Sequence, residues 1–182
     1  PKGVEVALEN GVDSIEHGAK PNAHITELFK ETGAFQVATL CPALPYGLFD
    51  CEVSHATKEQ KANGKVVFDG IIEMAKDNIA HGVPVGLGTD TACPFVTQYD
   101  MWRELDFYGK YCEVSNAFAL YTGTLLNATL AGVGDVTGSI EVGKCADMIV
   151  TKKNPLDNLS VLRHVQMVVK DGVIYDHPQV KK

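Results

Sequence analysis

Residues 70–90 read GIIEMAKDNIAHGVPVGLGTD, and this stretch decides the fold. Its first half places apolar residues every three to four positions, which indicates a helix. Gly82 stands where the end of a helix needs a left-handed residue, and the apolar run VPVGL that follows predicts a strand. The strand ends on the polar residue Asp90. A helix that leads directly into a short buried strand is typical of a parallel α/β protein.

The same helix–Gly–strand pattern occurs twice upstream, as VEVALENG-VDSIEHG in residues 4–18 and as ITELFKETG-AFQVATL in residues 25–40. Together the copies predict consecutive βα units with parallel strands between residues 4 and 110. The last two copies are separated by a longer stretch than the first two. The surplus, about residues 41–57, contains prolines and a glycine, and it is predicted to be a long loop of the kind that carries functional sites in α/β proteins.

The character of the chain changes after the last predicted strand of this series. Residues 99–130 are predicted to be helical, as MWRELDFYGKY and SNAFALYTGTLLNATLAG. Residues 138–176 contain short β-like runs, and Asp171-Gly172 is suited to the tight turn of an antiparallel hairpin. We therefore predict a parallel α/β part in residues 1–135 and a small β unit in residues 136–182.

Composition excludes several classes of function. The chain has 182 residues, 45% of them hydrophobic, and a formal net charge of -7. An acidic chain without a basic cluster is a poor ligand for nucleic acid or anionic membranes, and no apolar run has the roughly 20 residues that a membrane helix needs. An odd number of scattered cysteines indicates free thiols in a reducing cytoplasm. They are Cys41, Cys51, Cys93, Cys112 and Cys145.

Two polar residues follow strands of the predicted parallel sheet. His17 ends VDSIEH, and Asp90 ends VPVGLGTD. The carboxyl ends of parallel strands carry the sites of α/β proteins, so both are candidates for metal binding or catalysis. Two alternatives remain open on spacing alone. Asp90 could equally be the N-cap of the next helix, and His17 could be a core histidine bonded to a backbone carbonyl.

Weaker candidates lie nearby. His55 falls in the predicted loop and could contact a substrate. Cys93 lies three residues after Asp90 and could approach the site, although a buried free thiol is the more common case.

Three motifs, taken together, resemble a known family. IEHG at residues 15–18, GLGTD at 86–90 and GSIEVGKCADMIV at 138–150 resemble the amidohydrolase superfamily, and most of all its imidazolonepropionase and Xaa-Pro dipeptidase-like branch. The segment NPLDNLSVLRHVQMVVKDGVIY at 154–175 is similar to the usual end of such chains. The resemblance implies strands six to eight of a (β/α)8 TIM-like barrel and part of a small β-sandwich.

The resemblance also implies a chemistry. An intact enzyme of this family would hydrolyse the C–N bond of a small amide, a cyclic amide or a dipeptide, with a water activated by a divalent metal, most often zinc. Asp90 matches a residue that binds the metal and accepts a proton from the water. His17 matches a metal ligand or a substrate contact.

The other ligands of the family are expected upstream of Pro1, in an N-terminal part that this chain lacks. Catalytic zinc usually needs three protein ligands, so we expect the chain by itself to be inactive. We also expect a homo-oligomer or association with the missing N-terminal half. Alternatives are a non-catalytic binding or assembly domain, and a half-barrel subunit completed by another chain.

Overall fold

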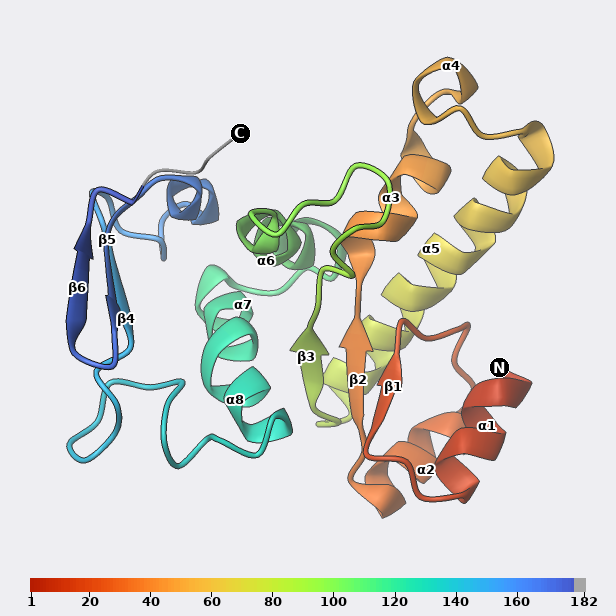
Figure 1. Cartoon of the computed structure of the whole chain (residues 1–182). Helices are drawn as coiled ribbons and strands as arrows, with labels where there is room; N and C mark the ends of the chain where they lie inside the picture. Colours follow the sequence, from red (N-terminus) through yellow and green to blue (C-terminus); the bar gives the residue numbers. More distant parts are fainter. Residues whose placement is uncertain (179–182) are drawn as a thin grey trace.

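The computed structural model describes residues 1–178, and its first part is built on a three-stranded parallel sheet. The strands are β1 (Ser14–Glu16), β2 (Phe35–Ala38) and β3 (Val85–Leu87), in the order β1-β2-β3 (Figure 1). The parallel arrangement of VDSIEH, AFQVATL and VPVGLGTD is therefore confirmed. Because the strands are parallel, their carboxyl ends lie at one edge of the sheet.

Helices alternate with these strands, as the repeated pattern predicts. They are α1 (Lys2–Glu9), α2 (Ala23–Thr32), α3 (Leu40–Leu48), α4 (Cys51–Ser54), α5 (Lys58–Ala80) and α6 (Met101–Tyr111). Gly33 ends α2 in the left-handed conformation, with φ 71°. One apolar core packs β2 and β3 against α3, α5 and α6, and a second packs α1, α2 and β1 together.

The prediction of a long loop at residues 41–57 is wrong, because most of α3 and all of α4 lie there. Pro42 falls in the first turn of α3, where a missing N–H leaves no hydrogen bond unmade. Pro45 is inside the helix, yet Leu40 and Leu44 are buried beside it in the core. Packing of this apolar face against the rest of the core therefore outweighs the local cost of the proline.

The last part of the chain leads from helices to a second sheet. Residues 116–130 form one continuous helical stretch, made of α7 (Asn116–Tyr121), the π-helical turn η1 (Thr122–Leu126) and α8 (Asn127–Leu130). The second sheet is antiparallel, in the order β4-β5-β6, with β4 (Met148–Thr151), β5 (Val165–Lys170) and β6 (Val173–Asp176).

The predicted hairpin is confirmed, since Asp171 and Gly172 join β5 to β6 with φ of 50° and 78°. The 3-10 helix η2 (Leu159–Arg163) attaches this part to the first core through the buried side chain of Leu159. The predicted β unit extends to residue 182, and its last four residues lie outside the described part of the chain.

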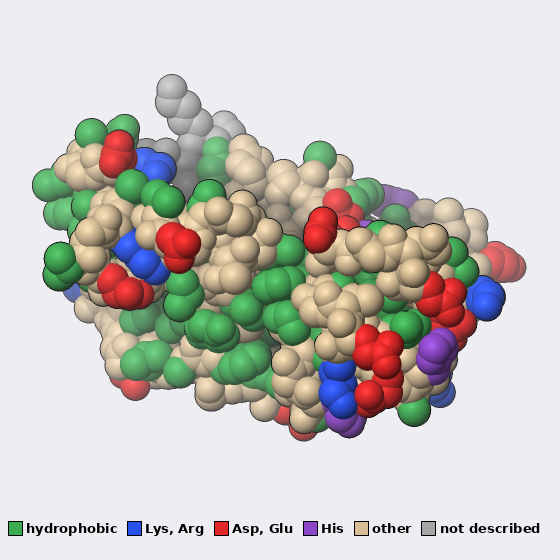
Figure 2. All heavy atoms as spheres, turned by 90° about the horizontal axis from the view of Figure 1, so that it is seen from below, with side chains coloured by type: hydrophobic (Ala, Val, Ile, Leu, Met, Phe, Trp, Pro, Cys, Tyr) green, Lys and Arg blue, Asp and Glu red, His purple; other side chains and the backbone are tan. Residues whose placement is uncertain are grey.

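Apolar side chains remain exposed on the surface. Figure 2 shows the face at the amino ends of the parallel strands, where hydrophobic side chains gather between charged regions. Ile140 and Val142, in the segment before β4, are 82% and 107% exposed. Among residues 1–178, no helix combines the length and the apolar character needed to cross a membrane.

Candidate active site

The structure brings His17 and Asp90 together. His17 directly follows β1 and Asp90 comes shortly after β3, so both lie at the carboxyl edge of the sheet with β2 between them. Nε2 of His17 is 3.8 Å from Oδ2 of Asp90. Their side chains are 47% and 48% exposed, which leaves room for a ligand and rules out the alternative of a core histidine.

Both residues have a backbone conformation that side chains disfavour. The φ angle is 63° at His17 and 51° at Asp90. Such left-handed residues cost free energy and tend to occur where a site requires them. The conformation of His17 is held by two hydrogen bonds: its N–H donates to the carbonyl of Val37 (2.9 Å), and its carbonyl accepts from Nε2 of Gln36 (2.9 Å).

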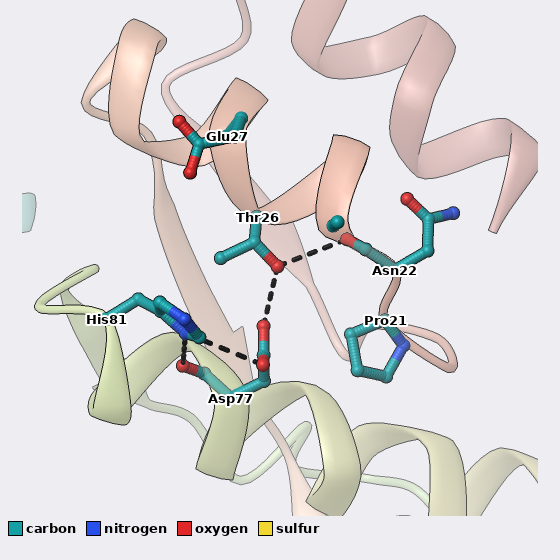
Figure 3. A pocket seen from close by; sticks show the side chains of 7 residues that line it. Pro21, Asn22, Thr26, Glu27, Asp77 and His81 are labelled. Carbon is teal, nitrogen blue, oxygen red and sulfur yellow. Dashed lines mark hydrogen bonds and ion pairs between the residues drawn. The ribbon is translucent and has the colours of Figure 1, made fainter.

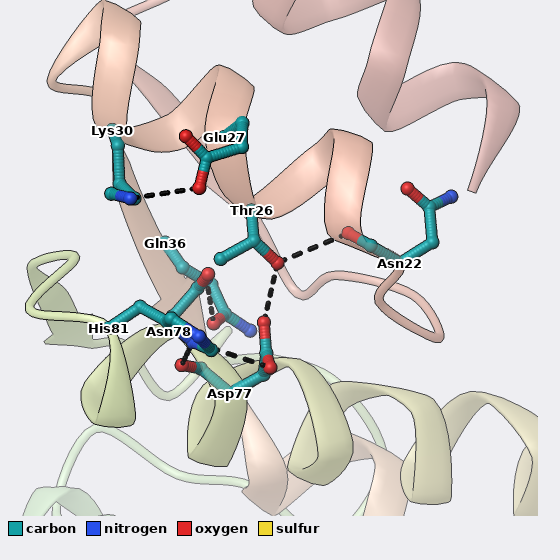
Figure 4. Close-up of polar contacts among 8 residues, drawn as sticks. All are labelled: Asn22, Thr26, Glu27, Lys30, Gln36, Asp77, Asn78 and His81. Carbon is teal, nitrogen blue, oxygen red and sulfur yellow. Dashed lines mark hydrogen bonds and ion pairs between the residues drawn. The ribbon is translucent and has the colours of Figure 1, made fainter.

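A buried polar chain supports that second bond. Gln36 lies on β2 and is fully buried, and its Oε1 accepts a hydrogen bond from Nδ2 of Asn78 on α5 (2.9 Å). Figure 4 shows Gln36 and Asn78 where α5 passes the sheet. The turn that carries His17 is thus tied to the helix layer through two amide side chains.

Thr39 is a site residue that the sequence analysis missed. It follows β2, the strand between the two candidates, and its Oγ1 forms a short hydrogen bond with Nδ1 of His17. The bond leaves Nε2 of the ring facing Asp90. A signal was available: Thr39 is the polar residue that ends AFQVAT, in the same position as His17 and Asp90 on their strands.

Asp90 does not cap the next helix. The N-cap of α6 is Asp100, and Asp90 lies in a turn where its backbone carbonyl accepts from the N–H of Cys93 (3.2 Å). The thiol of Cys93 also donates to Oδ2 of Asp90 at 3.7 Å. Burial, together with the charge of Asp90, raises the pKa of this thiol above its usual value. The structure thus brings Cys93 to the candidate site.

His55 has a different position. It follows α4 in a left-handed conformation with φ 54°, and it is exposed. No described residue forms a hydrogen bond or ion pair with its side chain, so the structure does not join it to His17 and Asp90. Its role in substrate binding stays a prediction.

The two facing donors fit part of a metal site. Zinc takes imidazole nitrogen and carboxylate oxygen at about 2.0–2.2 Å, so two donors less than about 4 Å apart can reach one ion. The 3.8 Å separation of Nε2 and Oδ2 meets this condition. Among residues 1–178, however, no group of three or more His, Cys, Asp or Glu side chains could hold a metal ion. By themselves, His17 and Asp90 would therefore not complete the ligand set of a catalytic metal.

A buried carboxylate lies behind the site. Glu104 on α6 is fully buried, and its two oxygens accept hydrogen bonds from the backbone N–H groups of Leu40 (2.6 Å) and Cys41 (2.8 Å). Burial raises the pKa of Glu104 to about 7, while the hydrogen bonds from Cys41 and from the two backbone groups act in the opposite direction.

Polar residues also gather in a pocket of about 270 Å³ on α2 and α5 (Figure 3). Within it, Thr26 donates to Asp77 (2.6 Å), and Nδ1 of His81 lies 3.5 Å from the other oxygen of Asp77. The bond from Thr26 connects α2 to α5, and the side chains of Thr26, Asp77 and His81 are paired with one another without a ligand. The pocket is lined by Pro21, Asn22, Ala23, Thr26, Glu27, Asp77 and His81.

Comparison with protein families gives a match over residues 68–175, to the amidohydrolase family. The chain belongs to the amidohydrolase family. The matched region includes Asp90 and all of the second sheet except its last residue, and it covers more than half of the chain. A search of curated proteins found no match.

Solved structures of similar proteins agree with this family. A candidate prolidase from Bifidobacterium longum superimposes with a TM-score of 0.96 and is 37% identical, over 100% of this chain and 46% of its own. A Xaa-Pro dipeptidase with methionine bound in its active site has a TM-score of 0.82 and 29% identity, over 96% of this chain and 42% of its own. Ochratoxinase of A. niger has a TM-score of 0.80 and 27% identity, over 98% and 40%.

This amidohydrolase chain therefore spans less than half the length of each of the three similar structures. Its resemblance to the prolidase and Xaa-Pro dipeptidase-like members is confirmed, whereas the imidazolonepropionase branch stays a prediction.

Proposed function

We propose that the complete protein hydrolyses the C–N bond of a Xaa-Pro dipeptide or of a related small amide or cyclic amide. The observation that carries the proposal is the convergence of His17 and Asp90 at the carboxyl edge of a parallel sheet, in an amidohydrolase chain. The similarity to a Xaa-Pro dipeptidase supports this choice of substrate class.

In this proposal both residues bind a metal, and Asp90 has a second role as proton acceptor. His17 and Asp90 hold a divalent metal, for which we propose zinc, together with ligands from the rest of the protein. When bound, such an ion would lower the pKa of its water and polarise the substrate carbonyl. Asp90 accepts a proton at Oδ2, and the exposure of its carboxylate gives water access to that oxygen. Thr39 fixes the His17 ring, and Cys93 and His55 are proposed to contact the substrate.

The proposal also places the chain within a larger fold. Strands β1, β2 and β3 would be strands six, seven and eight of a (β/α)8 barrel formed by residues 1–135. Residues 136–182 would contribute to a small β-sandwich. Exposed apolar residues such as Ile140 support a covering partner, either the N-terminal half of the protein or a second copy of it. We propose that the protein acts in the cytoplasm.

Substitution of Asp90 by Asn tests the proposed chemistry. Asn tolerates a left-handed backbone, so the fold should survive, but it lacks the charge that holds a cation and cannot accept a proton at neutral pH. General-base catalysis contributes about 10²–10⁴-fold, so we expect kcat/KM for Xaa-Pro dipeptides to fall by at least about 100-fold, with loss of bound metal.

The matched control is Asp171→Asn. Asp171 has φ 50°, almost the same as Asp90, and it lies in the β5–β6 turn. We expect the control to keep its activity and metal content. Equal activity and metal content in both variants would refute the proposed role of Asp90 and favour a non-catalytic binding or assembly domain.

A further inference from the structure

We propose that Glu104 is a positioning residue for the candidate site: by binding the first turn of α3, it frees the hydroxyl of Thr39 to orient the ring of His17. Glu104 contacts neither His17 nor Asp90, so it would act through Thr39. The inference rests on the proposed function only in treating His17 as a residue whose orientation matters.

The helix α3 begins without the usual cap from its own N-cap residue. The first N–H groups of a helix have no partner within the helix, and the side chain of the N-cap residue usually accepts from one of them. Asn22, Thr57 and Ser115 do this at the starts of α2, α5 and α7. Thr39 is the N-cap of α3 and has a suitable side chain, but it makes no cap hydrogen bond.

Glu104 supplies the missing acceptor. Its two oxygens bind the N–H groups of Leu40 and Cys41, which are the first two residues of α3. A carboxylate at this position also interacts favourably with the positive end of the helix dipole. The start of α3 is therefore satisfied by a side chain from a helix far along the chain.

The hydroxyl of Thr39 bonds with His17 instead of capping α3. A Thr side chain occupies one staggered rotamer at a time, so Oγ1 cannot face both the first turn of its own helix and the end of β1. In the structure it faces His17 and bonds with Nδ1 of the ring. With Glu104 on the N–H groups, this rotamer leaves no donor of the first two α3 residues unsatisfied.

The burial of Glu104 gives independent support. The residue is 0% exposed, and no Lys, Arg or His in the described part of the chain forms an ion pair with it. A buried carboxylate is costly unless its oxygens are bonded, and an apolar residue of similar size would usually be at least as stable. Its neighbours on α6, Leu105 and Tyr108, are core residues. Bonding to the start of α3 is the interaction that an apolar residue could not replace.

The test reads the tautomer of His17 by ¹⁵N NMR in the complete, metal-free protein with labelled histidine. The wild type should show a tautomer population that differs from that of a free imidazole, because Nδ1 of His17 bonds with Thr39, and Thr39→Val should change it toward the free mixture. Glu104→Gln should give the same change, because the amide keeps only one of the two oxygens that bind the N–H groups of Leu40 and Cys41. In the Thr39→Val background, Glu104→Gln should have no further effect, which separates action through Thr39 from general loosening.

Two further variants keep the test decisive. Glu104→Met removes both acceptor oxygens from the N–H groups of Leu40 and Cys41 and introduces no new polar side chain into the core. It replaces Glu104→Gln if circular dichroism shows that the latter is unfolded. Asp106→Asn, on the same helix, should leave the tautomer unchanged. Thr39→Ser should retain the wild-type tautomer, because it keeps the hydroxyl.

An unchanged tautomer in folded Glu104 variants would overturn the inference, as would an equal effect with and without Thr39. Zinc affinity provides a separate readout. Loss of a partner that orients a metal ligand typically weakens binding by about 10- to 100-fold, which is the change expected for Glu104→Gln. If the wild-type complete protein binds no metal, the proposed function fails, while the tautomer still decides the role of Glu104.

Discussion

At the scale of single residues, the turn after β1 shows how a site residue is held in a costly conformation. His17 is left-handed, and the next residue, Gly18, has φ 129°. A Cβ atom added to Gly18 would lie 2.8 Å from Sδ of Met74 and 2.9 Å from Nε2 of Gln36. The same amide of Gln36 binds the carbonyl of His17. A side chain at position 18 would therefore press against the same amide that holds the backbone of His17.

We predict that Gly18→Ala lowers both stability and metal affinity. A left-handed Ala costs about 1–2 kcal/mol by itself, and the contact with Gln36 adds to this and disturbs the turn. Gly11→Ala is the control, since Gly11 has φ 77° with nothing within 4 Å of the added Cβ. Urea unfolding and zinc titration of the complete protein measure both effects. Equal losses in the two variants would show that the contact with Gln36 is unimportant.

The sequence predicts some site residues better than others. His17 and Asp90 could be brought together from the sequence because a parallel sheet places the carboxyl ends of its strands at one edge. Glu104 could not be found in this way, since its partners at the start of α3 are set by tertiary packing. Its only signal is a charged residue on the apolar face of MWRELDFYGKY, one turn before Tyr108.

At the scale of elements, the same distinction applies. The three strands and the helices α2 and α5 follow from local signals, namely periodic apolar residues and a glycine at each turn. The helix α3 does not, because Pro42, Pro45 and Gly47 are local signals for a loop. Its formation depends on burial of Leu40 and Leu44 against distant residues, which no local pattern records.

The second sheet contains a carboxylate that should make its stability depend on pH. Asp147, just before β4, accepts from the N–H of Asp171, from Nζ of Lys170 and from Oγ1 of Thr137. These bonds, that of Asp171 first, lower the pKa of Asp147 from 3.8 to about 2. Between these two pKa values, Asp147 is protonated to a greater extent in the unfolded chain than in the folded one. The stabilisation is therefore complete above pH 4 and is lost as the pH falls through about 2.

We predict that amide hydrogens of the β5–β6 hairpin lose protection against exchange as the pH is lowered from 4 to 2, after correction for intrinsic rates. Asp147→Asn should remove this dependence, because Asn has no charge to lose. Asp157→Asn serves as the control and should behave as the wild type. Identical pH profiles in the wild type and the Asp147 variant would contradict the assignment.

At the scale of the whole molecule, the chain combines two candidate metal ligands with exposed apolar surface. The edge of β3 is bonded at one position, where the side chain of Asn127 pairs with both the N–H and the carbonyl of Leu87 (2.8 Å each). At the opposite side of the sheet, the outer edge of β1 has no strand partner among residues 1–178. Exposed edges of this kind tend to associate.

We therefore predict that the 182-residue chain, produced by itself, self-associates, binds divalent metal weakly and hydrolyses no dipeptide. Light scattering, chelator competition and dipeptide assays measure these properties. The control is the same chain mixed with the remaining part of the protein as a separate polypeptide, which should restore activity. Tight zinc binding and turnover by the isolated monomer would refute the prediction.

The position of α3 and α4 between β2 and α5 has an evolutionary consequence. The separation of His17 and Asp90 is set by the spacing of neighbouring strands, about 4.8 Å per step, and not by the length of chain that joins those strands. Insertions or deletions around α4, beyond the start of α3 that Glu104 binds, can therefore accumulate in a lineage without moving the two donors. Selection could change the preferred substrate through this segment of the chain while the reaction chemistry was inherited unchanged.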